Sequence, residues 1–211
     1  MTTMRLLNDA TSPFGRKVMV AAIERGLPLR EEFVDVAEAG ELDAHNPLRQ
    51  IPALVTERGD AVYDSSVILG FLDTLHGGEP LIPRDRAWSV ATRVALADGL
   101  IEATLQRAME LRRPEELRSA AVIARLEGRI GRALVAIDRI RPELALDPLR
   151  ADTIAVACAL DYVDFRYARS WRDELPALSA WQDSIAARPS MRMTAPTRTA
   201  PVAVGAGQAR S

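Results

Sequence analysis

The chain has 211 residues, enough for one large or two small domains, and its 27 basic side chains nearly balance 29 acidic ones. A net charge of −2 gives no reason to expect a nucleic-acid partner, and no stretch comes near the roughly 20 apolar residues that a membrane span needs. The first residues are too polar for a secretory signal, so we expect a cytoplasmic protein with no membrane partner.

The first half of the chain predicts a mixed α/β domain. Strands are predicted at 4–7, 29–36, 53–56 and 60–63, and helices at 13–26 and from 64 onward. The first helix joins the first two strands, which should therefore run parallel, and a turn at Gly59 joins the last two. The polar residues 37–46 are expected to cross the surface. This order gives a sheet covered by helices.

The second half predicts a helical bundle, because apolar residues recur at helical spacing and no convincing strand follows residue 86. The predicted helices are 88–111, 115–140, 152–167 and 176–187. We expect four segments: a first domain at 1–77, a linker at 78–86, a helical domain at 87–193 and a flexible tail at 194–211. The single cysteine, Cys158, lies in an apolar run and is expected to be a buried side chain rather than a reactive thiol.

Two neighbouring stretches of the first half suggest a ligand site. Pro52 has no N–H for a ladder, so it suits the start of a strand, and its peptide bond can be cis and turn the preceding backbone toward a bound extended peptide. Asp64 and Ser65 open a helix with free N–H groups, a hydroxyl and a carboxylate. Together these groups predict a site for the two charges of an amino-acid head, with an ordinary helix cap as the alternative.

Three phrases in this arrangement resemble the cytosolic glutathione transferase superfamily over nearly the whole chain. They are Ser12-Pro13-Phe14, the run Asn-Pro-Leu-Arg-Gln-Ile-Pro-Ala-Leu at 46–54 and the run Asp-Ser-Ser-Val-Ile at 64–68. The chain is most similar to bacterial members whose first helix opens with Ser-Pro-Phe. The resemblance implies a thioredoxin-like first domain of β-α-β-β-β-α order, an all-helical second domain, a homodimer and no metal.

The same resemblance implies that glutathione binds along the first domain as co-substrate. The bond from Ile51 to Pro52 would be cis, and the backbone of Ile51 would pair with the cysteinyl part. Asp64 and Ser65 would hold the γ-glutamyl end, and Gln50 would reach toward the glycyl end.

Phe14 and Asp98 complete the implied glutathione site. Phe14 would also face the second-substrate pocket. Asp98 lies where several relatives send an acid across the dimer interface toward the γ-glutamyl amine, although an exposed helix aspartate is an equally good explanation.

A serine or threonine hydroxyl is the implied catalytic group. Ser12 would donate a hydrogen bond to the glutathione sulfur and so favour the thiolate, aided by the field of the helix start. Thr11 is the rival, one residue earlier. Arg16 could add positive potential, although a solvated helix arginine is the commoner explanation.

The second substrate is expected to be a small hydrophobic electrophile held between the halves by Leu105, Met109, Tyr162 and Arg166. The implied reaction is conjugation or reduction of that electrophile by the glutathione thiolate. The alternatives are glutathione-dependent isomerisation or dehalogenation, and a non-enzymatic protein that binds a ligand or partner. One departure from the family pattern is the run Arg150-Ala151-Asp152-Thr153 at the start of a core helix, where relatives carry a Ser or Thr three residues before an Asp.

Overall fold

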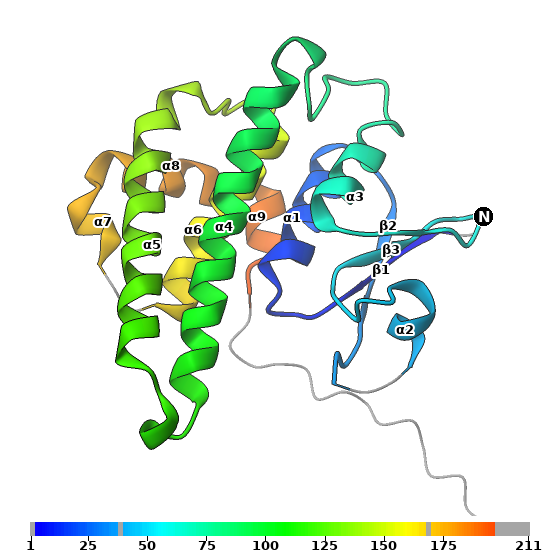
Figure 1. Ribbon diagram of the computed structural model, residues 1–211. Helices are drawn as coiled ribbons and strands as arrows, with labels where there is room; N and C mark the ends of the chain where they lie inside the picture. The colour runs from blue at the N-terminus through cyan, green and yellow to red at the C-terminus, as the bar shows by residue number, and fades with distance from the viewer. Residues whose placement is uncertain (1–2, 38–39, 168–169, 197–211) are drawn as a thin grey trace, which may run out of the picture.

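The computed structural model describes residues 3–37, 40–167 and 170–196 (Figure 1). A sheet with helices on its faces lies beside a second group of mostly longer helices. This arrangement confirms the predicted fold class, a mixed-sheet first half followed by an all-helical second half. Most of the expected tail, residues 197–211, and residues 38–39 of the polar crossing lie outside the described residues.

Four strands form one sheet in the order β2-β1-β3-β4. Strand β1 (Met4–Asn8) pairs in parallel with β2 (Leu29–Phe33), as predicted for two strands joined by a helix. On its other side β1 pairs antiparallel with β3 (Ala53–Val55), which continues through a hairpin into β4 (Ala61–Val62). The predicted turn is present, and it holds Gly59 at a φ of +89°, where a side chain would be strained.

Helices cover both faces of the sheet, because successive strand residues point to opposite faces. Helices α1 (Pro13–Glu24) and α3 (Ser65–Leu72) lie toward the helical half (Figure 1), where they join one large core. Helix α2 (Glu41–His45) packs near β3, within a smaller cluster made of Leu7, Leu42, Ala53 and Val55. The expectation that residues 37–46 merely cross the surface is therefore wrong, since part of this stretch is a helix that buries Leu42.

Helix α1 starts at the predicted residue and ends at Glu24, slightly before the predicted end at Gly26. The Oγ of Ser12 accepts the N–H of Gly15 at 3.2 Å, and Pro13 takes the first helical position, where no N–H is needed. A Cβ on Gly15 would lie 1.8 Å from Oδ1 of Asn8, so glycine lets the helix start approach the end of β1. The helix terminates before Gly26, whose φ of +62° is typical of a helix C-terminus.

The helical half is built around α6 (Ala151–Arg166), in which residues 151–160 are all buried. Helices α4 (Ala87–Arg112) and α8 (Pro176–Ala186) pack against α6, and α5 (Ala120–Ile140) packs against α4. Helix α1 of the first half also contacts α6 (Figure 1). The start of α1 therefore meets the helical half at its contact with α6.

Short elements account for most differences from the predicted helices. Helices α7 (Trp171–Glu174) and α9 (Pro189–Met193) are too short to show a helical period in the sequence. The helix predicted from residue 115 begins at Ala120 instead, after a 3-10 turn, because Ser119 caps it by accepting the N–H of Val122 at 3.3 Å.

The linker is held more closely than its glycines and prolines suggest. Asp73, which follows the last residue of α3, accepts the N–H groups of Leu81 and Ile82. Leu81 is buried, and its carbonyl accepts the N–H of Ala151 at 3.0 Å. Both contacts meet at Leu81, within the linker: its N–H donates to the residue that follows α3, and its carbonyl accepts from the start of α6. Leu75, whose spacing fits α3, lies beyond the end of that helix and is exposed.

Three further features of the described residues bear on function: their helices, their possible metal ligands and the single cysteine. None of their helices is both long and apolar enough to cross a membrane. Within the same residues, no group of three or more His, Cys, Asp or Glu side chains is placed to hold a metal ion. Cys158 is buried, as predicted, and burial is the main reason that the pKa of its thiol rises to about 11.

Candidate functional site

Two hydroxyls follow the end of β1, and they differ in their hydrogen bonds. Oγ1 of Thr11 donates to Oδ1 of Asp9 at 2.6 Å and accepts from Nη2 of Arg166 at 3.2 Å, so its proton is already used. Oγ of Ser12 accepts the N–H of Gly15, and no described residue takes its proton. Ser12 can therefore donate to a ligand at once, whereas Thr11 would first have to release the carboxylate of Asp9.

A compact loop places the backbone of Ile51 next to β3. The loop is held by the buried Asn46, whose Nδ2 donates to the carbonyl of Gln50 at 2.7 Å and whose Oδ1 accepts the N–H of Leu48 at 3.0 Å. The Ile51–Pro52 peptide is cis, as predicted, and β3 begins directly after it. Because Ile51 lies outside the ladder and the side chain of Gln50 is exposed, both are available to an extended ligand along this edge.

The start of α3 carries a buried hydroxyl that has no hydrogen-bond partner among the residues that the structure describes. Asp64 caps the helix, as predicted, because its Oδ1 accepts the N–H of Ser66 at 2.7 Å. Ser65 is 2% exposed, yet its Oγ has no hydrogen-bond partner among the described residues. An ordinary cap explains Asp64 but not Ser65, since a buried unpaired polar group costs about 1–3 kcal/mol. A ligand that hydrogen-bonds Ser65 would offset that cost.

A partly buried ion pair supports the same helix start. Lys17 of α1 is fully buried, and its Nζ lies 2.7 and 2.9 Å from the two carboxylate oxygens of Asp98 on α4. Oγ of Ser66 donates to the same carboxylate at 3.0 Å. The alternative that Asp98 is an exposed helix residue is therefore wrong. Within this chain its charge is balanced by Lys17, and the cluster joins α1, α3 and α4.

Arg16 is also paired rather than solvated. It is 7% exposed, and its Nη1 lies 2.7 Å from Oδ2 of Asp161 on α6. Its Nη2 donates to the carbonyl of Met191 at 3.1 Å and its Nε to Oγ1 of Thr194 at 3.3 Å. The solvated-arginine explanation is wrong, and the expected tail begins with a residue that contacts α1. Because Asp161 balances its charge, Arg16 adds little net potential at Ser12.

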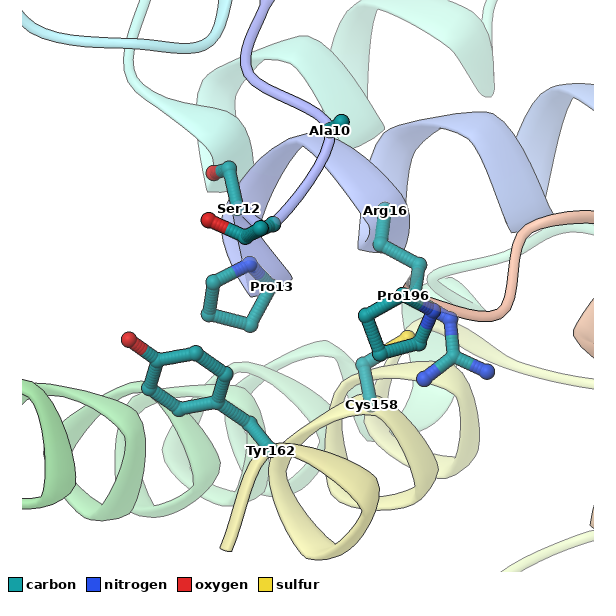
Figure 2. Close-up of a pocket in the computed structure, with 8 residues that line it drawn as sticks. Ala10, Ser12, Pro13, Arg16, Cys158, Tyr162 and Pro196 are labelled. Carbon is teal, nitrogen blue, oxygen red and sulfur yellow. The ribbon is translucent and has the colours of Figure 1, made fainter. Parts of the chain in front are cut away.

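A cavity of about 10 Å³ lies beside Ser12, roughly the space that one water molecule needs. Figure 2 shows the ring of Tyr162, from α6, beneath Pro13, with its hydroxyl on the side of Ser12. The other labelled side chains on the far side of this cavity are Arg16, Cys158 and Pro196. A second substrate is too large for this space, so the cavity forms only the inner wall of a substrate site.

The remaining predicted pocket residues fall into two groups. Phe14 is half-buried, with Nζ of Lys17 5.8 Å from the centre of its ring, and Arg166 reaches Thr11. These two lie with Tyr162 at the start of α1. Leu105 and Met109 are 37% and 51% exposed on α4, and neither lines the cavity at Ser12. The structure thus brings part of the predicted pocket to Ser12 and leaves two members as exposed apolar side chains.

Three side chains that shape the site escape sequence reasoning. Lys17 is the only lysine of the chain, which could have drawn attention to it, but its pairing with Asp98 joins residues 81 positions apart. Asp161 likewise meets Arg16 only through the packing of α6 on α1. Asn46 begins the run 46–54 that resembles the family. The sequence does not show that its side chain both donates to Gln50 and accepts from Leu48, because these contacts form only in the folded loop.

The arrangement suits a small anionic thiol compound. The N-terminal ends of α1 and α3 each carry the partial positive charge of a helix start, and each has a serine hydroxyl with hydrogen-bonding capacity left. A hydroxyl that donates to sulfur, together with that field, stabilises a thiolate and lowers the pKa of the thiol. The exposed edge at Ile51 lies between the loop and β3 and offers backbone pairing for the rest of such a ligand.

Comparison with known proteins identifies the family to which this chain is similar. Residues 11–75 match the family model described as the glutathione S-transferase, N-terminal domain. The chain is 32% identical over 204 residues to an uncharacterized GST-like protein of Escherichia coli K12, YibF, covering 92% of this chain and 100% of that protein.

Two solved structures extend the similarity to the fold. One is a glutathione transferase family member from Pseudomonas fluorescens Pf-5 with bound glutathione, at 39% identity and a TM-score of 0.85, covering 92% of this chain and all of that one. The other, a family member from the same organism, holds S-(propanoic acid)-glutathione, at 37% identity and a TM-score of 0.82, covering 92% and 98% of the two chains. The chain belongs to the glutathione S-transferase family.

Proposed function

We propose that this protein is a glutathione transferase that activates the thiol of glutathione at Ser12 and transfers it to an electrophile held against α6. The observation that carries the proposal is the pair of serine hydroxyls at two helix starts. Among the described residues, the proton of Ser12 has no acceptor and the buried Oγ of Ser65 has no partner. The two related Pseudomonas structures, one with bound glutathione and one with bound S-(propanoic acid)-glutathione, support it.

The proposed roles follow from the contacts of each group. Ser65, the amides at the start of α3 and Asp64 would hold the charged γ-glutamyl end, while Ile51 would pair with the cysteinyl backbone and Gln50 would face the glycyl end. Asp98 would act from behind, through Ser66, rather than as a free acid. This ligand direction brings the thiol toward Ser12, at the start of α1.

The proposed chemistry needs no base from the protein. Ser12 donates its hydroxyl proton in a hydrogen bond to sulfur and does not attack. The thiol proton leaves to solvent, and the thiolate electron pair forms the new carbon–sulfur bond while a leaving group departs or an alkene accepts the electrons. Positioning and a lowered thiol pKa together supply the rate enhancement.

Changing Ser65 to alanine tests the binding half of the proposal. We expect the dissociation constant for glutathione to rise by roughly 5- to 150-fold, because the loss of a charge-assisted hydrogen bond costs about 1–3 kcal/mol. Isothermal titration calorimetry measures it. Ser119→Ala is the matched control, since Ser119 caps α5 and should leave glutathione affinity unchanged while it lowers stability. An unchanged dissociation constant in Ser65→Ala would remove Ser65 from the site.

A panel of electrophiles separates the proposed activity from its alternatives. Turnover of aryl halides, conjugated carbonyl compounds or peroxides would support conjugation or reduction. Turnover confined to maleylacetoacetate-type substrates or to haloalkanes would instead indicate isomerisation or dehalogenation by the same thiolate. Saturable glutathione binding with no turnover across the panel would favour a non-enzymatic binding protein. Cross-linking or sedimentation tests the expected homodimer separately.

A further inference from the structure

The last residue of α6, Arg166, brings a guanidinium group to the proposed reaction centre. Its Nη2 donates to Oγ1 of Thr11 at 3.2 Å, and Thr11 is the neighbour of Ser12 in the chain. Nε of Arg166 is buried and has no hydrogen-bond partner among the described residues. The side chain is therefore fixed at one nitrogen and still has donors to give.

The charge of Arg166 is not balanced in the way that neighbouring arginines are. Arg16 pairs with Asp161 at 2.7 Å, Arg107 with Glu127 at 2.8 Å and Arg172 with Asp164 at 2.7 Å. Arg166 has no ion pair with any carboxylate in the described part of the chain. It reaches Asp9 only through the hydroxyl of Thr11, which donates to Asp9 and accepts from Arg166.

Two aromatic rings hold the guanidinium without neutralising it. Its Cζ lies 4.5 Å from the centre of the Phe165 ring and 5.5 Å from that of Tyr162. Cation–π contacts and the bond to Thr11 fix the orientation of the planar group. Tyr162 in turn lines the cavity at Ser12 (Figure 2). A partly buried cation, pre-oriented beside the proposed thiolate site and without a counter-ion among the described residues, is arranged to receive an anion from outside.

We propose that Arg166 binds a carboxylate on the electrophile, so that the second substrate is a small apolar electrophile carrying an acidic group. This inference rests on the proposed function, because it names the substrate class of the same site. Carboxylate is the favoured partner, because the planar fork of arginine can bind both of its oxygens. Thr11 acts as a positioning residue for Arg166, which gives a role to the hydroxyl whose proton already goes to Asp9.

The test compares two glutathione adducts that differ in one group. S-(2-carboxyethyl)glutathione carries a carboxylate, and S-(2-carbamoylethyl)glutathione carries an uncharged amide of nearly the same shape. We expect the wild-type protein to bind the acid roughly 10- to 100-fold more tightly than the amide in calorimetric titrations, as for a charge-assisted pair. Arg166→Gln should bring this ratio close to one without changing the affinity for glutathione itself, and Arg166→Lys should keep part of it.

Two further variants guard the interpretation. Arg107→Gln removes a nearby arginine that is already paired with Glu127, and it should keep the wild-type ratio. Thr11→Val keeps the charge of Arg166 but removes the bond that orients it, so the ratio should fall partway even if Arg166→Gln fails to fold.

Each other outcome counts against a defined claim. If the wild-type protein binds glutathione but binds the two adducts with equal affinity, the carboxylate preference is wrong and the proposed function still stands. A ratio lost in Arg107→Gln but kept in Arg166→Gln would assign the preference to the wrong arginine and overturn the inference. Failure of the wild-type protein to bind glutathione and both adducts would remove the proposed function and this inference together.

Discussion

Changing Ser12 to alanine is expected to lower kcat/KM for glutathione conjugation by roughly 10- to 150-fold, because a hydrogen bond to a charged group contributes about 1.5–3 kcal/mol. The hydroxyl of Ser12 accepts the N–H of Gly15 and has a proton left for the sulfur. Without that proton, the same free energy should raise the pKa of the bound thiol by about 1–2 units. The ultraviolet absorbance of the thiolate, followed against pH, measures the pKa directly.

Glutathione affinity measured near or below neutral pH should change little in Ser12→Ala. Most of the proposed binding contacts lie at the start of α3 and at Ile51, and the thiol would be largely protonated there in the variant. The effect on kcat/KM should therefore be largest at neutral pH and diminish as rising pH ionises the thiol without help.

Thr11 supplies the matched comparison for Ser12. Its hydroxyl proton already goes to Asp9, so Thr11→Val should leave the pKa of the bound thiol near the wild-type value. If Thr11→Val raises that pKa and Ser12→Ala does not, the assignment of the catalytic hydroxyl is wrong. The two variants should therefore change different measurements. Ser12→Ala should change the pKa of the bound thiol, and Thr11→Val should change the preference for the acidic adduct over the neutral one.

Sequence reasoning predicts the parts of this fold that depend on local pattern. Alternating and helical spacing predict the four strands and the long helices, and Gly26 and Gly59 mark ends and turns because their backbone conformations exclude most other residues. It fails for α2, α7 and α9, because five residues or fewer cannot show a helical period. The boundary at Ser119 shows that a cap can override an apolar pattern that extends further upstream.

The candidate site likewise has a part that local sequence patterns predict and a part that depends on contacts between distant segments. Asp64 and Ser65 can be predicted as binding groups because helix starts have a recognisable local chemistry, whereas Ser12 is predicted through the resemblance to the family. The partners of Arg16 and Lys17 cannot, because Asp161 and Asp98 come from distant helices that only the packing of the two halves brings close. The same packing shows that Arg166 has no counter-ion in the part of the chain that the structure describes, which a count of charges along the sequence cannot show.

Changing Asp152 to alanine is expected to lower the free energy of unfolding by about 3–5 kcal/mol, because it removes the buried partner of two arginines. Asp152 is fully buried at the start of α6, with Oδ2 3.2 Å from Nη1 of Arg93 and Oδ1 3.3 Å from Nε of Arg150. Its Oδ1 also accepts the N–H of Thr153 at 3.0 Å. Arg150, at the N-cap position of α6, makes no side-chain cap and instead pairs with this carboxylate.

The loss should appear as a fall in melting temperature of roughly 6–20 °C in calorimetry or circular dichroism, given about 2–4 °C per kcal/mol for a chain of this size. Asp152→Asn keeps a hydrogen-bond acceptor but not the charge, so it should fall between the wild type and Asp152→Ala. Glu143→Gln is the matched control: Glu143 also pairs with Arg93, but it is 62% exposed, and an exposed pair contributes less than about 1 kcal/mol. Equal losses in Asp152→Ala and Glu143→Gln would show that burial of the carboxylate is not what makes this ion pair important. Because Asp152 stabilises the helix that carries Tyr162 and Arg166 rather than contacting a substrate, folded Asp152→Asn should retain the wild-type preference between the two adducts.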